Sequence, residues 1–233
     1  MLTQKFILPQ CTAEITASEQ RETCFVTAGG RRPDLNWLQK AAAGYTVYCA
    51  DAGGACCLEA GIVPQRLYGD GDSAGAEVYK KLAVQGTKIF KYPPAKDDTD
   101  LQLVLQQLTG CNLIVSGIWG GRFDHLYSNV FSLLGYKEKH GCQVIMADEQ
   151  EVMLLLQASE SVHVSIDKLQ NVKAVSLLPL SNEVQVNIAG VRWPLQEAKL
   201  QLLYPYAISN EPLGDFTCDC LSGAVGLYLC FTE

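Results

Sequence analysis

The chain has 233 residues, enough for one large domain or two modest ones, and its 48% apolar and 18% charged residues are typical of a globular protein. A net charge of −7 argues against nucleic-acid binding, which calls for clustered Lys and Arg, and no apolar run approaches the roughly 18 residues that cross a membrane. Residues 1–9 lack the basic start and the cleavage site of a signal peptide, so we expect a cytoplasmic protein.

Ten cysteines are present, but none of them form a CxxC pair. The three histidines, His125, His140 and His163, do not stand at the spacing of zinc ligands. We therefore expect reduced, mostly buried thiols that pack as small apolar side chains.

Short apolar runs alternate with helix-compatible stretches over the first two-thirds of the chain. Strands are expected at residues 23–28, 46–50, 66–68, 87–92, 112–116 and 143–147, and helices at 33–43, 55–61, 74–85, 98–108 and 124–139. Strand alternating with helix predicts a mostly parallel sheet covered on both faces. The prediction is an α/β fold with an N-terminal three-layer domain over residues 1–148.

The pattern changes after about residue 150. Val184, Val186 and Ile188 alternate with polar residues, as in a half-buried strand, and short apolar runs follow at 152–156, 162–166, 173–178 and 226–231. No long helical period is visible there. These features predict a smaller all-β sandwich or barrel domain over residues 149–233.

Acidic residues follow four of the predicted strands, at the point where each strand ends. They are Asp51 after strand 46–50, Asp70 and Asp72 after 66–68, Asp97, Asp98 and Asp100 after 87–92, and Asp124 after 112–116. A single Asp at such a turn is more often a helix cap than a ligand. The carboxyl ends of parallel strands share one edge of the sheet, however, so four such turns in register predict a converged functional site.

Converged carboxylates repel one another and call for a counter-ion. A hard cation with oxygen ligands fits, and Mg²⁺ held by carboxylates and substrate phosphates is the expected one. Glycines beside the acids let backbone N–H groups approach phosphate oxygens, while Arg122 and Lys96 can neutralise further charge. The pattern predicts phosphoryl-type transfer, which depends mainly on positioning and charge stabilisation.

Three neighbouring features can be interpreted either structurally or functionally. Asp98 is expected to be a helix cap or a solvent-facing acid, since Asp97 and Asp100 suffice for the site. His125 can contact a phosphate or serve only its own helix. The loop Gly29-Gly30-Arg31-Arg32 also follows a strand and can meet phosphate or act as a plain connection.

Several blocks of the sequence resemble, in order and spacing, the signature blocks of thiamine pyrophosphokinases. They are Asp51-Ala-Gly-Gly54, Gly69-Asp-Gly-Asp-Ser73, Lys96-Asp-Asp-Thr-Asp100 and Gly120-Gly-Arg-Phe-Asp-His125, followed by Asn129, Ser176-Leu-Leu-Pro-Leu180, Gly190-Val-Arg-Trp193 and Ser209-Asn210. The resemblance covers nearly the whole chain from about Thr23. Single blocks are weakly specific, whereas their ordered set is strongly specific.

This resemblance implies an α/β domain followed by a β-sandwich domain, a homodimer, and transfer of diphosphate from ATP to the hydroxyl of thiamine with release of AMP. It implies a metal and phosphate cluster of Asp51, Asp70, Asp72 and Asp100. It implies nucleotide or phosphate contacts at Gly53, Asp97, Thr99, Arg122 and Asp124, and thiamine contacts at Trp193, Ser209 and Asn210. Trp193 would reach a site at the dimer interface, where an aromatic face suits the cationic thiazolium ring; otherwise it is a core tryptophan of the β domain.

Two positions depart from the pattern of the family. The family usually has Asp-Gly-Gly or Asp-Arg-Gly where this chain has Asp51-Ala52-Gly53, and we expect the change to be mild if Ala52 has an ordinary φ. The family also favours a bulky aromatic residue between the two aspartates of its Gly-Asp-x-Asp-Ser block, where this chain has Gly71. A glycine there loosens the backbone between two expected ligands and can alter how the substrate is packed.

In the mechanism that follows, the hydroxyl of thiamine attacks the β-phosphorus of a magnesium-bound triphosphate and AMP leaves. Lys96 and Arg122 stabilise the developing charge, and either Asp72 or Asp100 accepts the hydroxyl proton. Three alternatives stay open: a diphosphokinase for a related alcohol such as a pterin or a thiamine analogue, a catalytically inactive protein that binds thiamine or nucleotide, and a metal-dependent phosphatase.

Overall fold

The computed structural model describes residues 2–71, 75–93 and 95–231. The chain divides into two compact units, an α/β unit at Arg21–Asp148 and a β unit composed of Met1–Gln20 and Glu149–Glu233. The division after Asp148 coincides with the boundary expected from the sequence.

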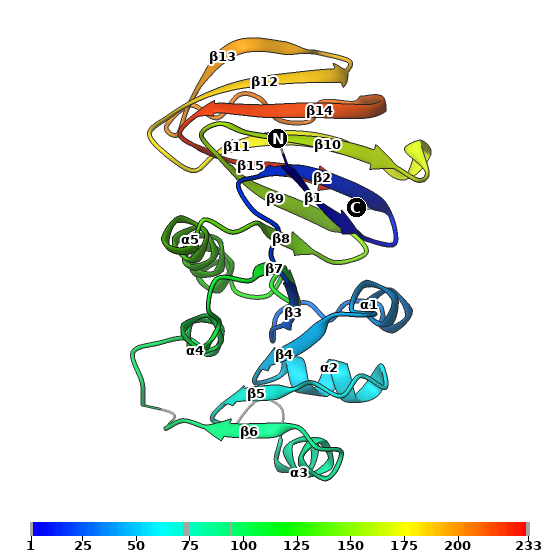
Figure 1. The fold of residues 1–233 in the computed structure, drawn as a ribbon, viewed down its shortest axis with the longest axis vertical. Helices are drawn as coiled ribbons and strands as arrows, with labels where there is room; N and C mark the ends of the chain where they lie inside the picture. Colours follow the sequence, from blue (N-terminus) through cyan, green and yellow to red (C-terminus); the bar gives the residue numbers. More distant parts are fainter. Residues whose placement is uncertain (1, 72–74, 94, 232–233) are drawn as a thin grey trace. The chain divides into compact units, whose positions relative to one another are not determined.

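The α/β unit is built on six parallel strands in the order β8-β7-β3-β4-β5-β6 (Figure 1). The strands are β3 (Thr23–Thr27), β4 (Thr46–Ala50), β5 (Arg66–Gly69), β6 (Lys88–Lys91), β7 (Asn112–Ser116) and β8 (Val144–Ala147). From β3 the chain adds strands in one direction as far as β6, and then crosses back to place β7 on the other side of β3. The switch point of the sheet therefore lies between β3 and β7.

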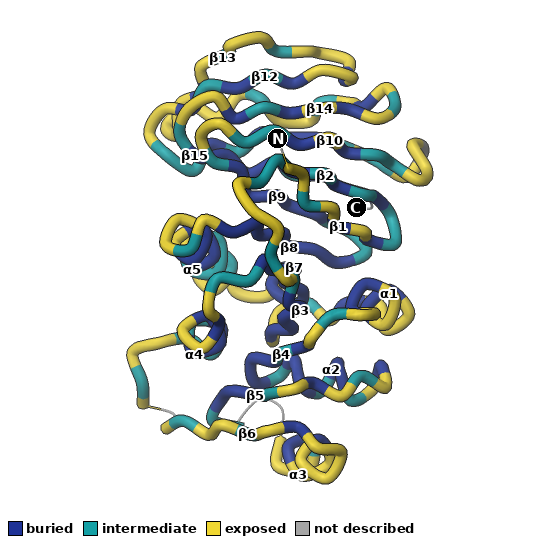
Figure 2. The backbone as a smooth tube through the Cα atoms, in the orientation of Figure 1, coloured by how far each residue is buried: buried dark blue, intermediate teal, exposed yellow. Residues whose placement is uncertain are grey.

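Five helices cover this sheet in the predicted three-layer arrangement. They are α1 (Leu35–Ala41), α2 (Gly53–Glu59), α3 (Ala76–Val84), α4 (Asp100–Gln107) and α5 (Phe123–His140). Helices α1, α2 and α3 lie on one face, and α4 and α5 lie on the other (Figure 1). All five residues of β7 are buried, as expected for a central strand covered on both faces (Figure 2).

The β unit contains two antiparallel groups of strands. One has the order β1-β2-β10-β14-β12-β13 and the other β9-β15-β11. The strands are β1 (Leu2–Ile7), β2 (Cys11–Ala17), β9 (Glu151–Gln157), β10 (Glu160–Ile166), β11 (Ala174–Pro179), β12 (Glu183–Val191), β13 (Leu195–Gln201), β14 (Pro212–Ser222) and β15 (Ala224–Cys230), with a short 3₁₀ helix η1 (Leu169–Asn171). Strands β10 and β14 of the first group contact β9 of the second, so apolar side chains of both form one core. This is the strand-rich, smaller second domain that the sequence predicts.

The first 20 residues correct the predicted domain boundaries. The sequence assigned them to the α/β domain over residues 1–148, whereas β2 pairs with β10 in the β unit, with Ile15 opposite Val162. Alternate residues of β2, Cys11, Ala13 and Ile15, are buried there. The partner strand β10 lies more than 140 positions further along the chain, and local sequence patterns do not reveal such a pairing, which explains the difference.

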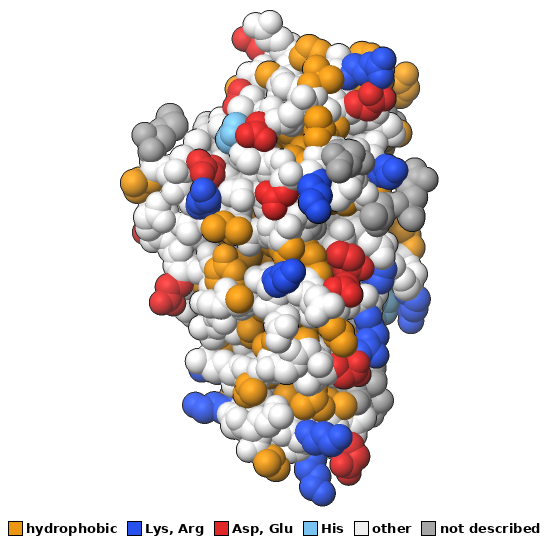
Figure 3. Space-filling view, turned by 90° about the vertical axis from the view of Figure 1, so that its right-hand side faces the viewer, with side chains coloured by type: hydrophobic (Ala, Val, Ile, Leu, Met, Phe, Trp, Pro, Cys, Tyr) orange, Lys and Arg blue, Asp and Glu red, His pale blue; other side chains and the backbone are white. Residues whose placement is uncertain are grey.

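The ten cysteines are all unbridged and most are buried, as expected for thiols that act as small apolar groups. No helix in the part of the chain that the structure describes has the length and apolar character needed to cross a membrane. On the face shown in Figure 3, acidic and basic side chains are interspersed among hydrophobic ones, and neither sign of charge dominates.

Gly53, the first residue of α2, is required by the contact between this helix and β3. A Cβ atom added to it would lie 2.2 Å from the carbonyl oxygen of Thr27. We expect Gly53→Ala to lower the free energy of unfolding by about 1–3 kcal/mol, the usual cost of overpacking, as measured by urea denaturation. The control is Gly135→Ala in α5, where nothing lies within 4 Å and alanine should stabilise the helix by roughly 0.5–1 kcal/mol. Equal effects of the two substitutions would contradict the packing role of Gly53.

Candidate active site

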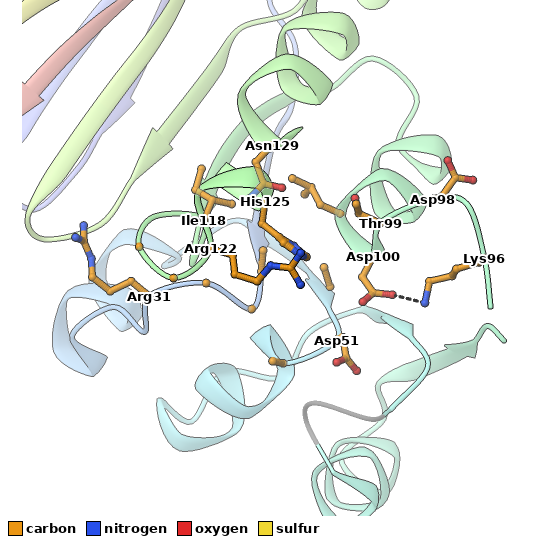
Figure 4. Close-up of a pocket in the computed structure, with 18 residues that line it drawn as sticks. Arg31, Asp51, Lys96, Asp98, Thr99, Asp100, Ile118, Arg122, His125 and Asn129 are labelled. Carbon is orange, nitrogen blue, oxygen red and sulfur yellow. Dashed lines mark ion pairs between the residues drawn. The ribbon is translucent and has the colours of Figure 1, made fainter. Parts of the chain in front are cut away.

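A cavity of about 590 Å³ opens at the carboxyl ends of the parallel strands, at the switch point of the sheet (Figure 4). Its wall comes from residues 28–31 after β3, 50–52 after β4, 118 and 120–122 after β7, residues 96 and 98–101 around the start of α4, and His125 and Asn129 of α5. Open α/β sheets bind their ligands at this place. Asp100 and Arg122 point toward the same space and Asp51 lies in its wall, whereas Arg31 and Asp98 point away from it (Figure 4).

Asp51 is buried and has a φ of +33°, a conformation that residues other than glycine rarely adopt. Its carboxylate Oδ1 accepts hydrogen bonds from the Tyr79 hydroxyl at 2.7 Å and from the Gly71 amide at 3.2 Å. Burial, and then the adjacent Asp51 carboxylate, raise the pKa of Tyr79 and keep its phenol protonated. Ala52 has an ordinary φ of −58°, which meets the condition under which we expect the change from the family pattern at this position to be mild.

Lys96 lies between two of the predicted ligands. Its Nζ is 3.0 Å from Asp70 Oδ2 and 3.0 Å from Asp100 Oδ1, and all three side chains are largely buried. Burial raises the pKa of Asp100, Lys96 counteracts this, and the charges of Asp51 and Asp70 raise it further. Burial alone would lower the pKa of Lys96, but its pairing with Asp100 and Asp70 raises the pKa overall. The structure thus brings Asp51, Asp70 and Asp100 together, with an ammonium group as their counter-charge.

The start of α4 decides between the two interpretations of Asp98, which is a solvent-facing acid and not the helix cap. Thr99, not Asp98, is the N-cap of this helix: its hydroxyl accepts a hydrogen bond from the Gln102 amide at 3.3 Å, and the Gln102 side chain accepts one from the Thr99 amide at 2.8 Å. This capping box aims the N-terminus of α4 and its first residue, Asp100, at the cavity. Thr99 lines the cavity as predicted, and Asp97 is exposed outside its wall.

Arg122 and Asp124 form an exposed pair at the N-terminus of α5. The guanidinium donates to both carboxylate oxygens, at 3.1 and 2.5 Å, and this pairing lowers the pKa of Asp124. Arg122 lines the cavity together with His125 of the same helix, whereas Asp124 does not. His125 therefore has the position that its functional interpretation requires.

The loop after β3 is held by hydrogen bonds within the protein. The amides of Gly30 and Arg31 donate to the carbonyl oxygens of Gly117 and Trp119 at 2.5 Å each. The Arg31 guanidinium pairs with the buried Asp148 at 2.6 Å. The amides of Gly30 and Arg31 thus fasten the two sides of the switch point to each other, and residues 28–31 of the same loop also line the cavity.

Some predicted residues do not line the cavity. Within the described residues these are Gly53, Asp70, Asp97 and Asp124. Gly53 packs against Thr27, and Asp70 reaches the site through Lys96. Asp72, predicted as a metal ligand and a possible base, lies outside the described residues. Tyr79 was missed, because a tyrosine within a helical pattern carries no signal of the carboxylate it will meet.

The donor atoms at this site fit a hard cation only in part. Asp51, Asp70 and Asp100 offer carboxylate oxygens, and buried Asp100 Oδ1 makes its ion pair with Lys96 without a hydrogen bond of acceptable geometry. Among the residues that the structure describes, no three acidic, His or Cys side chains already stand as a complete metal site. In the absence of a metal, Lys96 takes up the negative charge of Asp70 and Asp100.

The three predicted thiamine contacts lie together in the β unit. The amide of Trp193 donates to Asn210 Oδ1 at 3.1 Å, and Asn210 Nδ2 donates to the Trp193 carbonyl oxygen at 2.7 Å. The amide of the neighbouring Ser209 donates to the Ser176 hydroxyl at 3.0 Å. The Trp193 side chain is 54% exposed, which contradicts the alternative of a core tryptophan. Its ring lies 5.2 Å from the guanidinium of Arg192.

Fold and site together define a doubly wound α/β unit with carboxylates and basic side chains around a cavity at its switch point, in one chain with a β unit. The chain matches the family models "Thiamin pyrophosphokinase, catalytic domain" over residues 39–146 and "Thiamin pyrophosphokinase, vitamin B1 binding domain" over residues 161–219. It belongs to the thiamine pyrophosphokinase family. Membership of this family implies a diphosphotransferase, or kinase, activity.

Known proteins agree with this assignment. The chain is 28% identical over 198 residues to the thiamine pyrophosphokinase of Bacillus subtilis, covering 82% of this chain and 89% of that protein. The crystal structure of the thiamin pyrophosphokinase from Geobacillus thermodenitrificans has a TM-score of 0.75 at 27% identity, covering 91% of this chain and 98% of that one. The Bacillus subtilis crystal structure has the same fold, with a TM-score of 0.78 at 23% identity over 91% of this chain and all of that one.

Lys96 should stabilise the metal-free site. Lys96→Met leaves two largely buried carboxylates without their counter-charge, so we expect the free energy of unfolding in EDTA at pH 7 to fall by about 1–3 kcal/mol, less than for a fully buried pair. Added Mg²⁺ should then stabilise the variant more than the parent, because the cation no longer competes with an ammonium group. The control is Lys80→Met, at an exposed position of α3. Equal losses at both positions in urea denaturation would disprove this role.

Proposed function

We propose that the protein transfers the diphosphate group of ATP to the hydroxyl of thiamine, giving thiamine diphosphate and AMP. One observation carries this proposal: Lys96 bridges Asp70 and Asp100 beside a cavity that Asp51 and Asp100 line, in a chain that matches both thiamine pyrophosphokinase models. A triphosphate can bind beside these carboxylates only if the negative charge of the triphosphate is offset. The cytoplasm is the proposed location, in keeping with ten unbridged cysteines.

Asp51, Asp70 and Asp100, together with Asp72, would hold Mg²⁺. The bound cation would neutralise charge on the triphosphate and on the phosphorus under attack. The Lys96 ammonium lies 3.0 Å from two of these carboxylates. When the triphosphate binds, this ammonium would move from the carboxylates to the phosphate oxygens. Asp100 and Asp72 are the two candidates for the group that accepts the hydroxyl proton.

Helix α5 supplies the opposite side of the phosphate site. Its N-terminus lies at the cavity, which Arg122 and His125 line, and the helix dipole favours an anion there. Gly120 and Gly121, with φ of +66° and +68°, form the turn that brings the chain into this helix. The Arg122 guanidinium, already aimed at the cavity, can exchange Asp124 for a phosphate oxygen. Thr99 and Asp97 are the further nucleotide contacts proposed at the start of α4.

For thiamine we propose the exposed face of Trp193, with Ser209 and Asn210 beside it. The cationic thiazolium ring would lie on the indole, where Arg192 now lies. We also propose a homodimer with the thiamine site at the subunit interface. Residues of the same unit expose large apolar side chains, among them Leu203, Tyr204, Ile208 and Leu213, and such side chains favour burial in an interface.

The reaction can be tested directly by mass spectrometry of a mixture of ATP, Mg²⁺ and thiamine. We expect thiamine diphosphate and AMP in equal amounts, and Asp100→Asn should reduce their formation by at least about 10²-fold, since it removes a ligand and a candidate base. Asp34→Asn is the matched control. Asp34 is the N-cap of α1 and accepts a hydrogen bond from the Trp37 amide, and asparagine is an equally good N-cap.

Other products would identify the alternatives. Inorganic phosphate without any added alcohol would indicate a phosphatase, and AMP formed only with a different alcohol would indicate a related diphosphokinase. Thiamine binding without AMP would indicate a binding protein. Each of these outcomes rules out the proposed reaction.

Trp193 gives a second test, specific to thiamine. Trp193→Ala should raise KM for thiamine by roughly 5- to 30-fold, the range of a desolvated cation–π contact, and leave KM for ATP unchanged. Trp193→Phe keeps an aromatic face and should retain most of the affinity. Steady-state kinetics in both substrates measure the effect, and an unchanged KM for thiamine in the alanine variant would refute the contact.

A further inference from the structure

Asp51 is held in its unusual backbone conformation by the main chain around it. Its amide donates to the carbonyl oxygen of Tyr68 at 2.8 Å, and its own carbonyl oxygen accepts from the Gly54 amide at 2.9 Å in the first turn of α2. These bonds place the Cα atom of Asp51 at the end of β4, in the wall of the cavity. They leave the side chain to be oriented by other groups.

Tyr79 supplies that orientation from a different element. It lies in α3, its side chain is only 4% exposed, and its hydroxyl donates to Asp51 Oδ1 at 2.7 Å. The Gly71 amide donates to the same oxygen at 3.2 Å. Two donors on one oxygen restrict rotation of the carboxylate, so its orientation is set by the turn after β5 and by α3 together.

The surroundings leave room for this contact and for little else. A Cβ atom on Gly69 would lie 2.8 Å from the Tyr79 hydroxyl and 2.7 Å from the Asp51 Cβ. At Gly71, whose φ is +86°, an added Cβ would meet the Tyr79 ring at 3.6 Å. Lys91 Nζ lies 5.7 Å from the centre of the same ring. The tyrosine is therefore fixed by packing before any ligand arrives.

We propose that Tyr79 is a positioning residue of the metal and phosphate site, which holds the Asp51 carboxylate in the orientation that binds the cation. Tyr79 is not among the described residues that line the cavity, so it acts through Asp51 and does not touch the substrate. This inference rests on the proposed function, because it gives Asp51 the role of a metal ligand. Groups behind a metal ligand commonly set both the ligand's direction and the metal affinity.

The test is Tyr79→Phe, which removes one hydroxyl and keeps the ring. We expect the affinity of the nucleotide-free protein for Mn²⁺, measured by the loss of the free-ion electron paramagnetic resonance signal, to fall about 10- to 100-fold. The Mg²⁺ concentration for half-maximal turnover should rise by a similar factor. Tyr136→Phe is the matched control: this tyrosine is also buried, and its hydroxyl donates to the Cys111 carbonyl oxygen at 3.2 Å, away from the cavity. It should bind Mn²⁺ as the parent does.

A second pair of variants separates positioning from a general loss of stability. In an Asp51→Asn background, Tyr79→Phe should cause no further loss of Mn²⁺ affinity, because there is no longer a carboxylate to orient. Equal losses in both backgrounds, or equal losses in Tyr79→Phe and Tyr136→Phe, would overturn the inference. Because the Mn²⁺ measurement needs no turnover, failure to form thiamine diphosphate would refute the proposed reaction and leave this result standing.

Discussion

Repulsion between carboxylates is the constraint on which the arrangement of the cavity depends. The parallel sheet delivers Asp51, Asp70 and Asp100 to one edge, and burial weakens the screening that water would provide. The ammonium group of Lys96, held 3.0 Å from two of the three, makes this arrangement stable without a bound ligand. The same group is mobile enough, on its four-carbon stem, to turn toward incoming phosphates. A site built in this way is stable when empty and ready for a polyanion that arrives with its own cation.

The rest of the α/β unit keeps these groups in register. Hydrogen bonds from Gly30 and Arg31 fasten the loop after β3 to the loop after β7, and the buried pair of Arg31 with Asp148 anchors it. Glycine is needed at position 30, because a Cβ there would lie 2.7 Å from the carbonyl oxygen of Gly117. The glycines around the cavity therefore serve close packing of loops as well as access to ligands, and Gly53 belongs to the same group.

Much of this organisation could be predicted because it depends on local patterns. Strands β4 and β7 begin and end at the predicted residues, since each is a short apolar run closed by a turn. The order of acids after strands predicted the shared edge, and the structure brings Asp51, Asp70 and Asp100 together there. Contacts across the fold could not be predicted in this way. Three such contacts join elements far apart in the sequence: the pairing of β2 with β10, the bridge made by Lys96, and the hydrogen bond from Tyr79. The choice of Thr99 over Asp98 as the helix cap depends on one backbone turn.

The glycine at position 71 shows how a departure from the family pattern is accommodated. The family favours a bulky aromatic residue there, whereas here the backbone adopts a φ of +86°, which glycine tolerates best. The Tyr79 ring fills the adjoining space, and the Gly71 amide becomes free to bond Asp51 Oδ1 at 3.2 Å. An aromatic group, Tyr79 of α3, stands beside the first acid, and its hydroxyl reaches the carboxylate. Gly71 and Tyr79 thus hold Asp51 together at the edge of the sheet.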